Sequence, residues 1–324
     1  MAVYTHISPA QLDQALRDFG LQLEGAPRGV ADGIENSTYF FDASDGAGRL
    51  RPLVLSIIED CPLGQLQYAC ALTTCLNNAA LPVPAPLRGR DHRLWFEIAG
   101  KPALIVPRMA GAHMLQPSSH ECGVIGDYLA RAHLAAAGLP DHFDNRRGLA
   151  WLEQAQTVLA PVLAADDSAL LDEEIRRYRR LARATLPRGA IHADLFRDNA
   201  LFEGRTLRAV IDFLFACTDW WLLDLAIAVN DWCATTEAPG FDGTRAAALL
   251  GAYARARPFS RDEHQCWQDM LCITATRFWV SRLLAAQSAD QCVNTKDPDE
   301  YRTLLRYRRE TFPTLPDAGL PQET

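Results

Sequence analysis

The chain contains very little lysine, because all but Lys101 and Lys296 of its 32 basic residues are arginine. This scarcity limits the positions at which a lysine could take part in chemistry. The chain also lacks an apolar run of about 18 residues, which a membrane-spanning helix needs. Its first residues have neither the basic start nor the apolar stretch of a secretory signal. We therefore expect a cytoplasmic protein that has no membrane partner.

Metal-binding patterns of cysteine and histidine are also missing. The nine cysteines are scattered, odd in number and never spaced as CxxC, and the eight histidines contain no HExxH. Scattered thiols in a chain this long are typical of a reducing compartment. The net charge of −8 argues against non-specific binding to nucleic acid. The 48% share of hydrophobic residues is enough to form a large buried core.

Segments with β character are concentrated in the first third of the chain. The runs at 38–41 and 53–58 are rich in β-branched and aromatic residues, and 93–98 with 102–109 is typical of a hairpin. A helix is expected between these pairs, at 62–79. The first hundred residues therefore predict a small, mostly antiparallel sheet with an internal helix.

Helical patterns dominate from residue 118 onward. Capping boxes of the form S-x-x-E or S-x-x-Q begin at Ser8, Ser118 and Ser260 and mark helix starts. Hydrophobic periodicity predicts helices at 118–137, 149–164, 168–185, 221–236, 242–256, 261–288 and 298–311. The predicted fold class is thus α+β with two lobes. Residues 1–106 form a small β-rich lobe and residues 107–324 a larger helical one, with a ligand site favoured between them.

The stretch AIHADLFRDNALF, at 190–202, carries a dense set of polar groups. The spacing from His192 through Asp194 to Asn199 fits the kinase catalytic loop H-x-D-L-x-x-x-N, and Asp212 stands where the Asp of DFG is found. Phosphoryl transfer needs a positioned oxygen nucleophile and cations that neutralise the phosphates. Asp194 can accept a hydroxyl proton, while Asn199 and Asp212 offer oxygen ligands that suit Mg²⁺. The pattern predicts Mg²⁺-dependent phosphoryl transfer from ATP.

Other polar residues near this motif are expected to support it. His192 should pack and hydrogen-bond to hold the loop, and Asp224 should brace the loop or cap a helix. Asp198 is most simply a turn residue, because an Asp-Asn pair alone usually marks a turn. Arg197 could reach a phosphate or lie in solvent, and the sequence leaves both alternatives open.

HADLFRDN followed by IDF resembles the aminoglycoside-phosphotransferase-like kinases, which often carry a small residue where Ala193 stands. Several segments, in order along the chain, are similar to the homoserine kinase branch of these enzymes: GIENSTYFF, GKPALIVPRMAG, HADLFRDNALF, IDFLFACTDWWLLDLAIAVNDWC, RFWVSRL and KDPDEY. The resemblance implies a two-lobed protein-kinase-like fold, with ATP as the donor. It also implies a small-molecule substrate, L-homoserine, and a step in threonine biosynthesis.

The same resemblance implies where the nucleotide binds. The loop over the ATP phosphates would span residues 33–37, with Gly33, Asn36 and Ser37 in contact with the nucleotide. The hinge that contacts adenine would include Val106 and Met109. A turn with glycine, backbone N–H groups and a hydroxyl suits phosphates, although by itself it is a weak signal.

One feature departs from the protein-kinase pattern. Ser56 stands on the third strand where protein kinases place the lysine that holds the α- and β-phosphates, and we expect Ser56 to border the nucleotide site. Because neither lysine is nearby in sequence, no partner is predicted for Glu59. Arg49 or Arg51 could substitute for the missing lysine, although both are more simply explained as solvated hairpin residues.

The acceptor site is less determined by the sequence. A homoserine carboxylate suits an arginine and its ammonium suits an acid. Arg277, Arg282 and Asp231 lie within apolar runs and therefore need partners. Each is either a substrate contact or part of a structural ion pair. The alternatives for the whole chain are a related kinase for an aminoglycoside, choline or sugar hydroxyl, or a nucleotide-binding protein without turnover.

Overall fold

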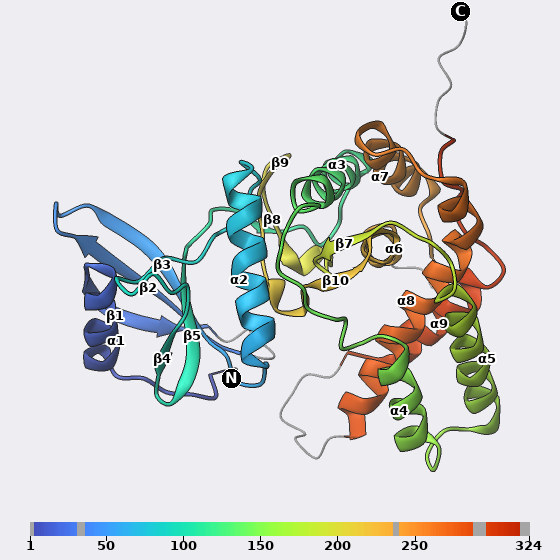
Figure 1. Ribbon diagram of the computed structural model, residues 1–324, viewed down its shortest axis with the longest axis horizontal. Helices are drawn as coiled ribbons and strands as arrows, with labels where there is room; N and C mark the ends of the chain where they lie inside the picture. Colours follow the sequence, from blue (N-terminus) through green and yellow to red (C-terminus); the bar gives the residue numbers. More distant parts are fainter. Residues whose placement is uncertain (1–2, 31–35, 236–239, 288–295, 318–324) are drawn as a thin grey trace, which may run out of the picture.

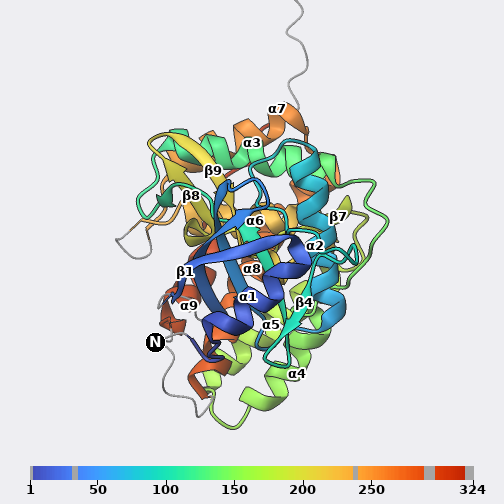
Figure 2. The same cartoon turned by 90° about the vertical axis from the view of Figure 1, so that its left-hand side faces the viewer.

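The computed structural model describes residues 3–30, 36–235, 240–287 and 296–317, which form two lobes (Figure 1). The smaller lobe contains a five-stranded antiparallel sheet in the order β1-β2-β3-β5-β4. The strands are β1 (Leu21–Gly29), β2 (Ser37–Asp45), β3 (Leu50–Ile57), β4 (Phe96–Ile98) and β5 (Lys101–Pro107). Helix α1 (Pro9–Leu16) covers the outer face of this sheet, as Figure 2 shows. Helix α2 (Leu63–Asn78) stands between the sheet and the larger lobe (Figure 1).

The larger lobe is mainly helical and carries two small sheets on the side next to α2 (Figure 1). One sheet pairs β7 with β10, and the other has the order β6-β8-β9. The helices of this lobe are α3 (Ser119–Ala135), α4 (Leu149–Leu159), α5 (Ala165–Leu181), α6 (Trp221–Trp232), α7 (Gly243–Ala256), α8 (Arg261–Gln287) and α9 (Pro298–Arg308). The short elements are β6 (Ala112–His113), β7 (Arg188–Ile191), β8 (Ala200–Glu203), β9 (Thr206–Val210) and β10 (Cys217–Trp220), with the 3₁₀ turns η1 (Arg17–Phe19), η2 (Arg197–Asn199) and η3 (Phe213–Phe215).

The predicted helix starts are confirmed by their capping geometry. At Ser8 and at Ser118 the cap side chain and the side chain three residues later exchange hydrogen bonds with each other's backbone. The backbone N–H of Ser260 donates to Glu263 at 2.9 Å, and the N–H of Glu263 donates back to the Ser260 hydroxyl at 3.2 Å. These reciprocal bonds satisfy N–H groups that have no partner within the helix.

Strand β1 is the one strand of the main sheet that the sequence analysis missed. Its pairing with β2 shifts register between Glu24 and Arg28. Gly25 lies there with φ of +74°, and Pro27 follows it. This irregularity breaks the alternation of apolar and polar residues by which a strand is recognised.

Helix α6 lies at the centre of the larger lobe, and its residues are buried on all sides. A helix that is apolar around its circumference belongs to a protein core or a membrane. Within the parts of the chain that the structure describes, no helix combines the length and apolarity needed to cross a bilayer. The burial of α6 therefore reflects its place between the helices of this lobe.

Helices α3 and α7 pack at very close range at Gly126. A Cβ atom built on Gly126 would lie 2.0 Å from the carbonyl oxygen of Leu249. Backbone cannot move away from such a contact as a flexible side chain can, so this position requires glycine.

We predict that Gly126→Ala destabilises the protein by about 1–3 kcal/mol, because the added methyl group overpacks this contact. Gly123→Ala, one turn earlier on the same helix, is the matched control, since its Cβ would meet the Ala248 carbonyl oxygen at 3.7 Å. The control should be neutral or up to about 1 kcal/mol stabilising. Urea unfolding of the two variants makes the comparison, and equal stabilities would contradict the packing argument.

Candidate active site

The catalytic-loop candidates lie between β7 and β8. The side-chain amide nitrogen of Asn199 donates to the Asp194 backbone carbonyl at 2.8 Å and to its carboxylate at 3.2 Å. Because the nitrogen of Asn199 faces Asp194, its amide oxygen remains for another partner. The half-buried Asp194 carboxylate is thus held in place beside a neutral oxygen ligand.

Asp212 comes next to this pair through backbone pairing, because the N–H of Ile211 donates to the carbonyl of Asn199 at 2.9 Å. Strand β9 ends at Val210, and Asp212 lies just beyond it, with φ of +61°, before η3. Its side chain is accessible to solvent, yet the surrounding protein raises the pKa of its carboxyl group. A solvent-accessible carboxylate with a raised pKa fits a residue at the base of an open site.

His192 holds the loop, as its side-chain contacts show. Its Nδ1 accepts the N–H of Asp194 at 3.2 Å, and its Nε2 lies 3.0 Å from the carbonyl oxygen of Ile211. These contacts require the tautomer with the proton on Nε2. The ring also packs on Phe213, with centroids 4.4 Å apart. His192 therefore links the segment of Asp194 to the segment of Asp212.

Asp224 supports the loop through hydrogen bonds to its backbone. Its carboxylate accepts the backbone N–H groups of His192 at 2.9 Å and of Ala193 at 2.7 Å, and it pairs with His133 at 3.1 Å. Burial alone would raise the pKa of Asp224, but these hydrogen bonds lower it. Ala193 adopts a left-handed φ of +62°, a conformation that costs free energy for a residue other than glycine. The Asp224 contacts hold the backbone in that conformation.

Asp231, which the sequence offered as a substrate contact, has a structural partner. It accepts the backbone N–H of Arg197 at 2.8 Å and its Nε at 3.1 Å. Arg197 also donates to the carbonyl of Leu115 at 3.0 Å. The sequence had not indicated this pairing as an alternative for Arg197. The ion pair instead anchors the end of the catalytic loop to α6.

Arg282 and Arg277 lie on α8 but differ in their surroundings. Arg282 donates to Glu300 at 2.7 Å and to the carbonyl of Asp297 at 2.6 Å, and its guanidinium lies over Tyr301. It ties α8 to α9, which agrees with the alternative of a structural ion pair. Arg277 is 3% exposed and has no ion pair with any residue that the structure describes.

The candidate residues of the phosphate loop belong to a hydrogen-bond network that the sequence did not reveal. Gly33 lies outside the described residues. Ser37 is fully buried, and its hydroxyl donates to Glu59 at 2.5 Å while accepting the N–H groups of Tyr4 and Thr5 at 2.8 Å each. This hydroxyl is engaged within the protein, and the contact of Ser37 with the nucleotide stays a prediction. Asn36 accepts the backbone N–H of Glu59 at 3.2 Å through its side-chain oxygen.

Glu59, for which no partner was predicted, forms an ion pair with Lys101. The two residues are 42 positions apart and meet because β3 and β5 are antiparallel neighbours. Burial alone would raise the pKa of Glu59, but Lys101 and the hydroxyls of Ser37 and Thr5 lower it. The pair can be found once the antiparallel pairing of β3 with β5 is known. Local sequence patterns do not reveal this pairing.

The other expected nucleotide contacts border the inner face of the sheet. Leu55 and Ile57 point into the core beneath α1, so Ser56 lies on the opposite face. Val106, which pairs with Val54, shares that face with Ser56 and is half-buried. Met109 lies two residues beyond the end of β5.

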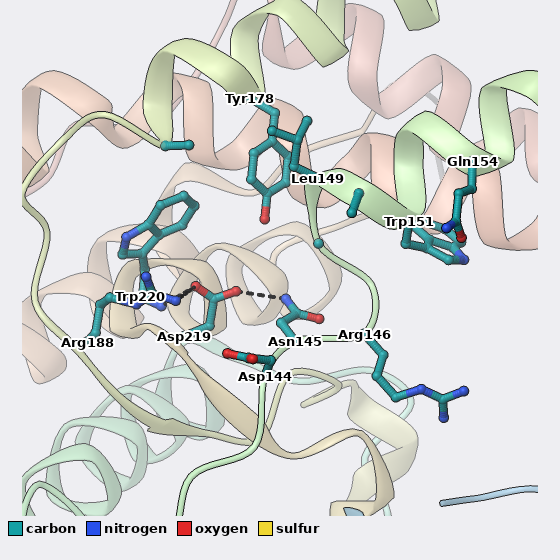
Figure 3. Close-up of a pocket in the computed structure, with 13 residues that line it drawn as sticks. Asp144, Asn145, Arg146, Leu149, Trp151, Gln154, Tyr178, Arg188, Asp219 and Trp220 are labelled. Atoms are coloured by element: carbon teal, nitrogen blue, oxygen red, sulfur yellow. Dashed lines mark hydrogen bonds and ion pairs between the residues drawn. The ribbon is translucent and has the colours of Figure 1, made fainter.

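A cavity of the larger lobe lies away from these residues. It has a volume of about 590 Å³ and lies among the loop before α4, helices α4 and α5, and the ends of β7 and β10. Figure 3 shows Tyr178 directed toward the space beside Asp219 and Asn145. Arg188 and Trp220 line it at the ends of their strands, whereas the catalytic loop leaves β7 from the other end, after Ile191. The catalytic arrangement, rather than cavity size, therefore locates the active site.

We predict that Glu59→Gln removes a pH-dependent part of the stability. A carboxyl group with a lowered pKa stabilises the fold above its ordinary value of 4.5 and loses this effect as the pH falls through its folded value. The variant should therefore lose about 1–2 kcal/mol near pH 7 and less below pH ~4. Glu203→Gln, at an exposed ion pair with Arg208, should lose at most about 1 kcal/mol. Denaturant titrations from pH 3 to 7 test this, and a pH-independent loss for Glu59→Gln would contradict it.

Comparison with known proteins agrees with the site. The model of a family described as "Phosphotransferase enzyme family" matches residues 27–259. The chain is 41% identical to a homoserine kinase of Cupriavidus taiwanensis, with 98% of both chains covered. It is 40% identical to a homoserine kinase of Pseudomonas aeruginosa, with 98% of this chain and 100% of the relative covered.

Solved structures share the fold at low sequence identity. An amicoumacin kinase in complex with AMP-PNP, Ca²⁺ and its substrate has a TM-score of 0.66 and 17% identity, covering 88% of this chain and 87% of that one. A spectinomycin phosphotransferase bound to ADP and spectinomycin has a TM-score of 0.60 and 10% identity, covering 92% and 93%. The two-lobed kinase-like fold expected from the sequence is confirmed. The chain belongs to the phosphotransferase enzyme family, in the branch formed by its homoserine kinase relatives.

Proposed function

We propose that the protein is a homoserine kinase, which transfers the γ-phosphoryl group of ATP to the hydroxyl of L-homoserine and releases ADP. The observation that carries this proposal is the identity of about 40% to named homoserine kinases over nearly the whole length of both chains. The neighbouring positions of Asp194, Asn199 and Asp212 support it, because they provide the groups that phosphoryl transfer needs. The product, O-phospho-L-homoserine, fits a step in threonine biosynthesis.

The donor set fits a divalent ion of the Mg²⁺ type. The described residues contain no group of three or more His, Cys, Asp or Glu that could hold a metal. The Asn199 amide oxygen and the Asp212 carboxylate instead form a two-residue oxygen set of the kind that binds Mg²⁺ together with phosphates and water. When bound there, Mg²⁺ would neutralise charge on the phosphates. Crowding by the protein raises the pKa of Asp212, and a cation beside it would favour its ionised form.

In the proposed reaction Asp194 acts on the acceptor. Its carboxylate, held by Asn199, orients the homoserine hydroxyl and accepts its proton as the O–P bond forms and the bond to ADP breaks. The nucleotide would lie against the inner face of the sheet, near Ser56 and Val106, with Met109 at the connection between the lobes. Asn36 would border the phosphates.

The pair of Glu59 and Lys101 supports the base of the phosphate loop. Glu59 bonds to the last two residues of the loop, through the Asn36 side chain and the Ser37 hydroxyl. On α2, Gln65 donates to the Leu214 carbonyl at 2.5 Å. Protein kinases pair a lysine on the third strand with a glutamate, whereas this chain has Ser56 on β3 and no acidic residue on α2. The ion pair of Glu59 with Lys101 instead supports the end of the phosphate loop.

We predict that Asp194→Asn lowers kcat by about 10²–10⁴-fold, because the amide cannot accept the hydroxyl proton. Its binding of ATP, measured by titration calorimetry, should stay within about threefold of wild type, because Asp194 acts on the acceptor. A variant with near-normal kcat would contradict this role, and a variant that also loses ATP binding would point to a structural defect.

The function itself is tested by ATP consumption with a panel of acceptors. L-homoserine should give the highest kcat/KM among L-homoserine, L-serine, L-threonine, choline and kanamycin, and ³¹P NMR should identify its product as O-phospho-L-homoserine. A clear preference for choline or kanamycin would assign the chain to another branch of the family. If no acceptor is phosphorylated, the result would indicate a nucleotide-binding protein without kinase activity.

A further inference from the structure

Arg277 is a buried cation whose hydrogen-bonding groups are unused. It is 3% exposed, and both its Nε and one terminal nitrogen are buried without a partner among the described residues. Two other buried arginines each keep a side-chain acceptor, since Arg257 forms an ion pair with Glu263 at 2.8 Å and Arg308 donates to Asn230 at 2.8 Å. One terminal nitrogen of Arg257 and both terminal nitrogens of Arg308 are also buried without a hydrogen-bond partner among the described residues. Leaving charged donors buried and unpaired costs free energy. A ligand that supplies the missing acceptors would remove this cost.

The position of Arg277 ties it to the reaction site. Its guanidinium lies 6.0 Å from the ring centroid of Phe215 and 5.1 Å from that of Phe278. Phe215 ends η3, the short turn that Asp212 caps at its start. Phe278 packs on Phe196, with centroids 4.6 Å apart. Phe196 follows Asp194 by two positions, so Arg277 is linked to the segment of Asp212 through Phe215 and to the segment of Asp194 through Phe278 and Phe196.

The aromatic rings stabilise the cation but do not neutralise it. Asp219 is a carboxylate close enough for Arg277 to influence its pKa, which burial raises and Arg277 helps to lower. However, Asp219 accepts the Asn145 amide and the Trp220 N–H at 2.8 Å each, and its ion pair is with Arg188. The planar guanidinium of Arg277 therefore still offers donors that lie side by side. A carboxylate can accept two hydrogen bonds from donors in this arrangement.

We propose that Arg277 binds the carboxylate of the acceptor and so selects a hydroxy amino acid over a plain amino alcohol. This assignment rests on the proposed kinase function and specifies how that site distinguishes its substrate. Bound in this way, the acceptor would place its charged end between Phe215 and Phe278 and its hydroxyl end at Asp194. Arg277 is therefore the specificity-determining residue among the three acceptor candidates of the sequence.

The test compares L-homoserine with 3-aminopropan-1-ol, which lacks only the carboxylate, in wild type and in Arg277→Met. The variant should lose at least about 100-fold in kcat/KM for homoserine, as expected for a buried charge pair. It should stay within about threefold of wild type for the amino alcohol. Single-turnover assays with enzyme in excess detect slow transfer. An equal loss for both acceptors, or an unchanged preference for homoserine, would overturn the proposal.

Arg282→Met is the matched control on the same helix. It breaks the ties to Glu300 and Asp297, so its Tm should fall while the ratio of the two kcat/KM values stays within about threefold of wild type. Arg277→Met should not lower Tm, because it replaces an unpaired buried charge with an apolar side chain of similar length. A variant that unfolds or melts well below wild type would show that the charge has a structural partner and would overturn the proposal.

A binding readout separates this assignment from the function. Homoserine should raise the Tm of wild-type protein in the presence of Mg²⁺ and AMP-PNP, and this shift should disappear in Arg277→Met and recover only in part in Arg277→Lys, which keeps the charge but loses the fork. Failure of wild type to phosphorylate homoserine would contradict the proposed function. Turnover of homoserine by wild type together with full binding by Arg277→Met would contradict the assignment of Arg277 alone.

Discussion

The site depends on the way α6 holds the backbone of the catalytic loop. Asp224, in the first turn of the helix, accepts the N–H groups of His192 and Ala193. Asp231, two turns later, accepts the N–H of Arg197, and the next residue, Trp232, donates to the carbonyl of Leu195. One buried helix thus fixes the loop at both ends and in its middle. Without these bonds the left-handed residue Ala193 would relax and Asp194 would lose its position.

The two lobes contribute different things to the reaction. The helical lobe supplies Asp194, Asn199 and Asp212 on segments that hydrogen-bond to one another, so their mutual geometry does not depend on the sheet. In the proposed reaction the small lobe supplies the face for the nucleotide and a loop whose last two residues bond to Glu59. Glu59 in turn forms an ion pair with Lys101 from the neighbouring strand.

The sequence predicted most of the fold because its helices carry local signals. The capping boxes at Ser8, Ser118 and Ser260 and the hydrophobic periodicity after them act over a few residues. The catalytic-loop pattern could also be recognised from the sequence, because its residues lie within a few positions of one another. The errors arose where contacts are distant in sequence: Asp231 meets Arg197 across 34 positions, and Glu59 meets Lys101 across 42. A charged residue in an apolar run signals a need for a partner but does not identify it.

The acceptor has two possible places, with its hydroxyl at Asp194 or within the cavity at Tyr178, and Arg277 is close enough to Asp219 of that cavity to influence its pKa. A crystal structure with L-homoserine, Mg²⁺ and AMP-PNP decides between them. The account predicts the homoserine hydroxyl about 2.6–3.2 Å from a carboxylate oxygen of Asp194, with the cation between Asn199 and Asp212. Homoserine bound in the cavity beside Asp219, with its hydroxyl remote from Asp194, would contradict it.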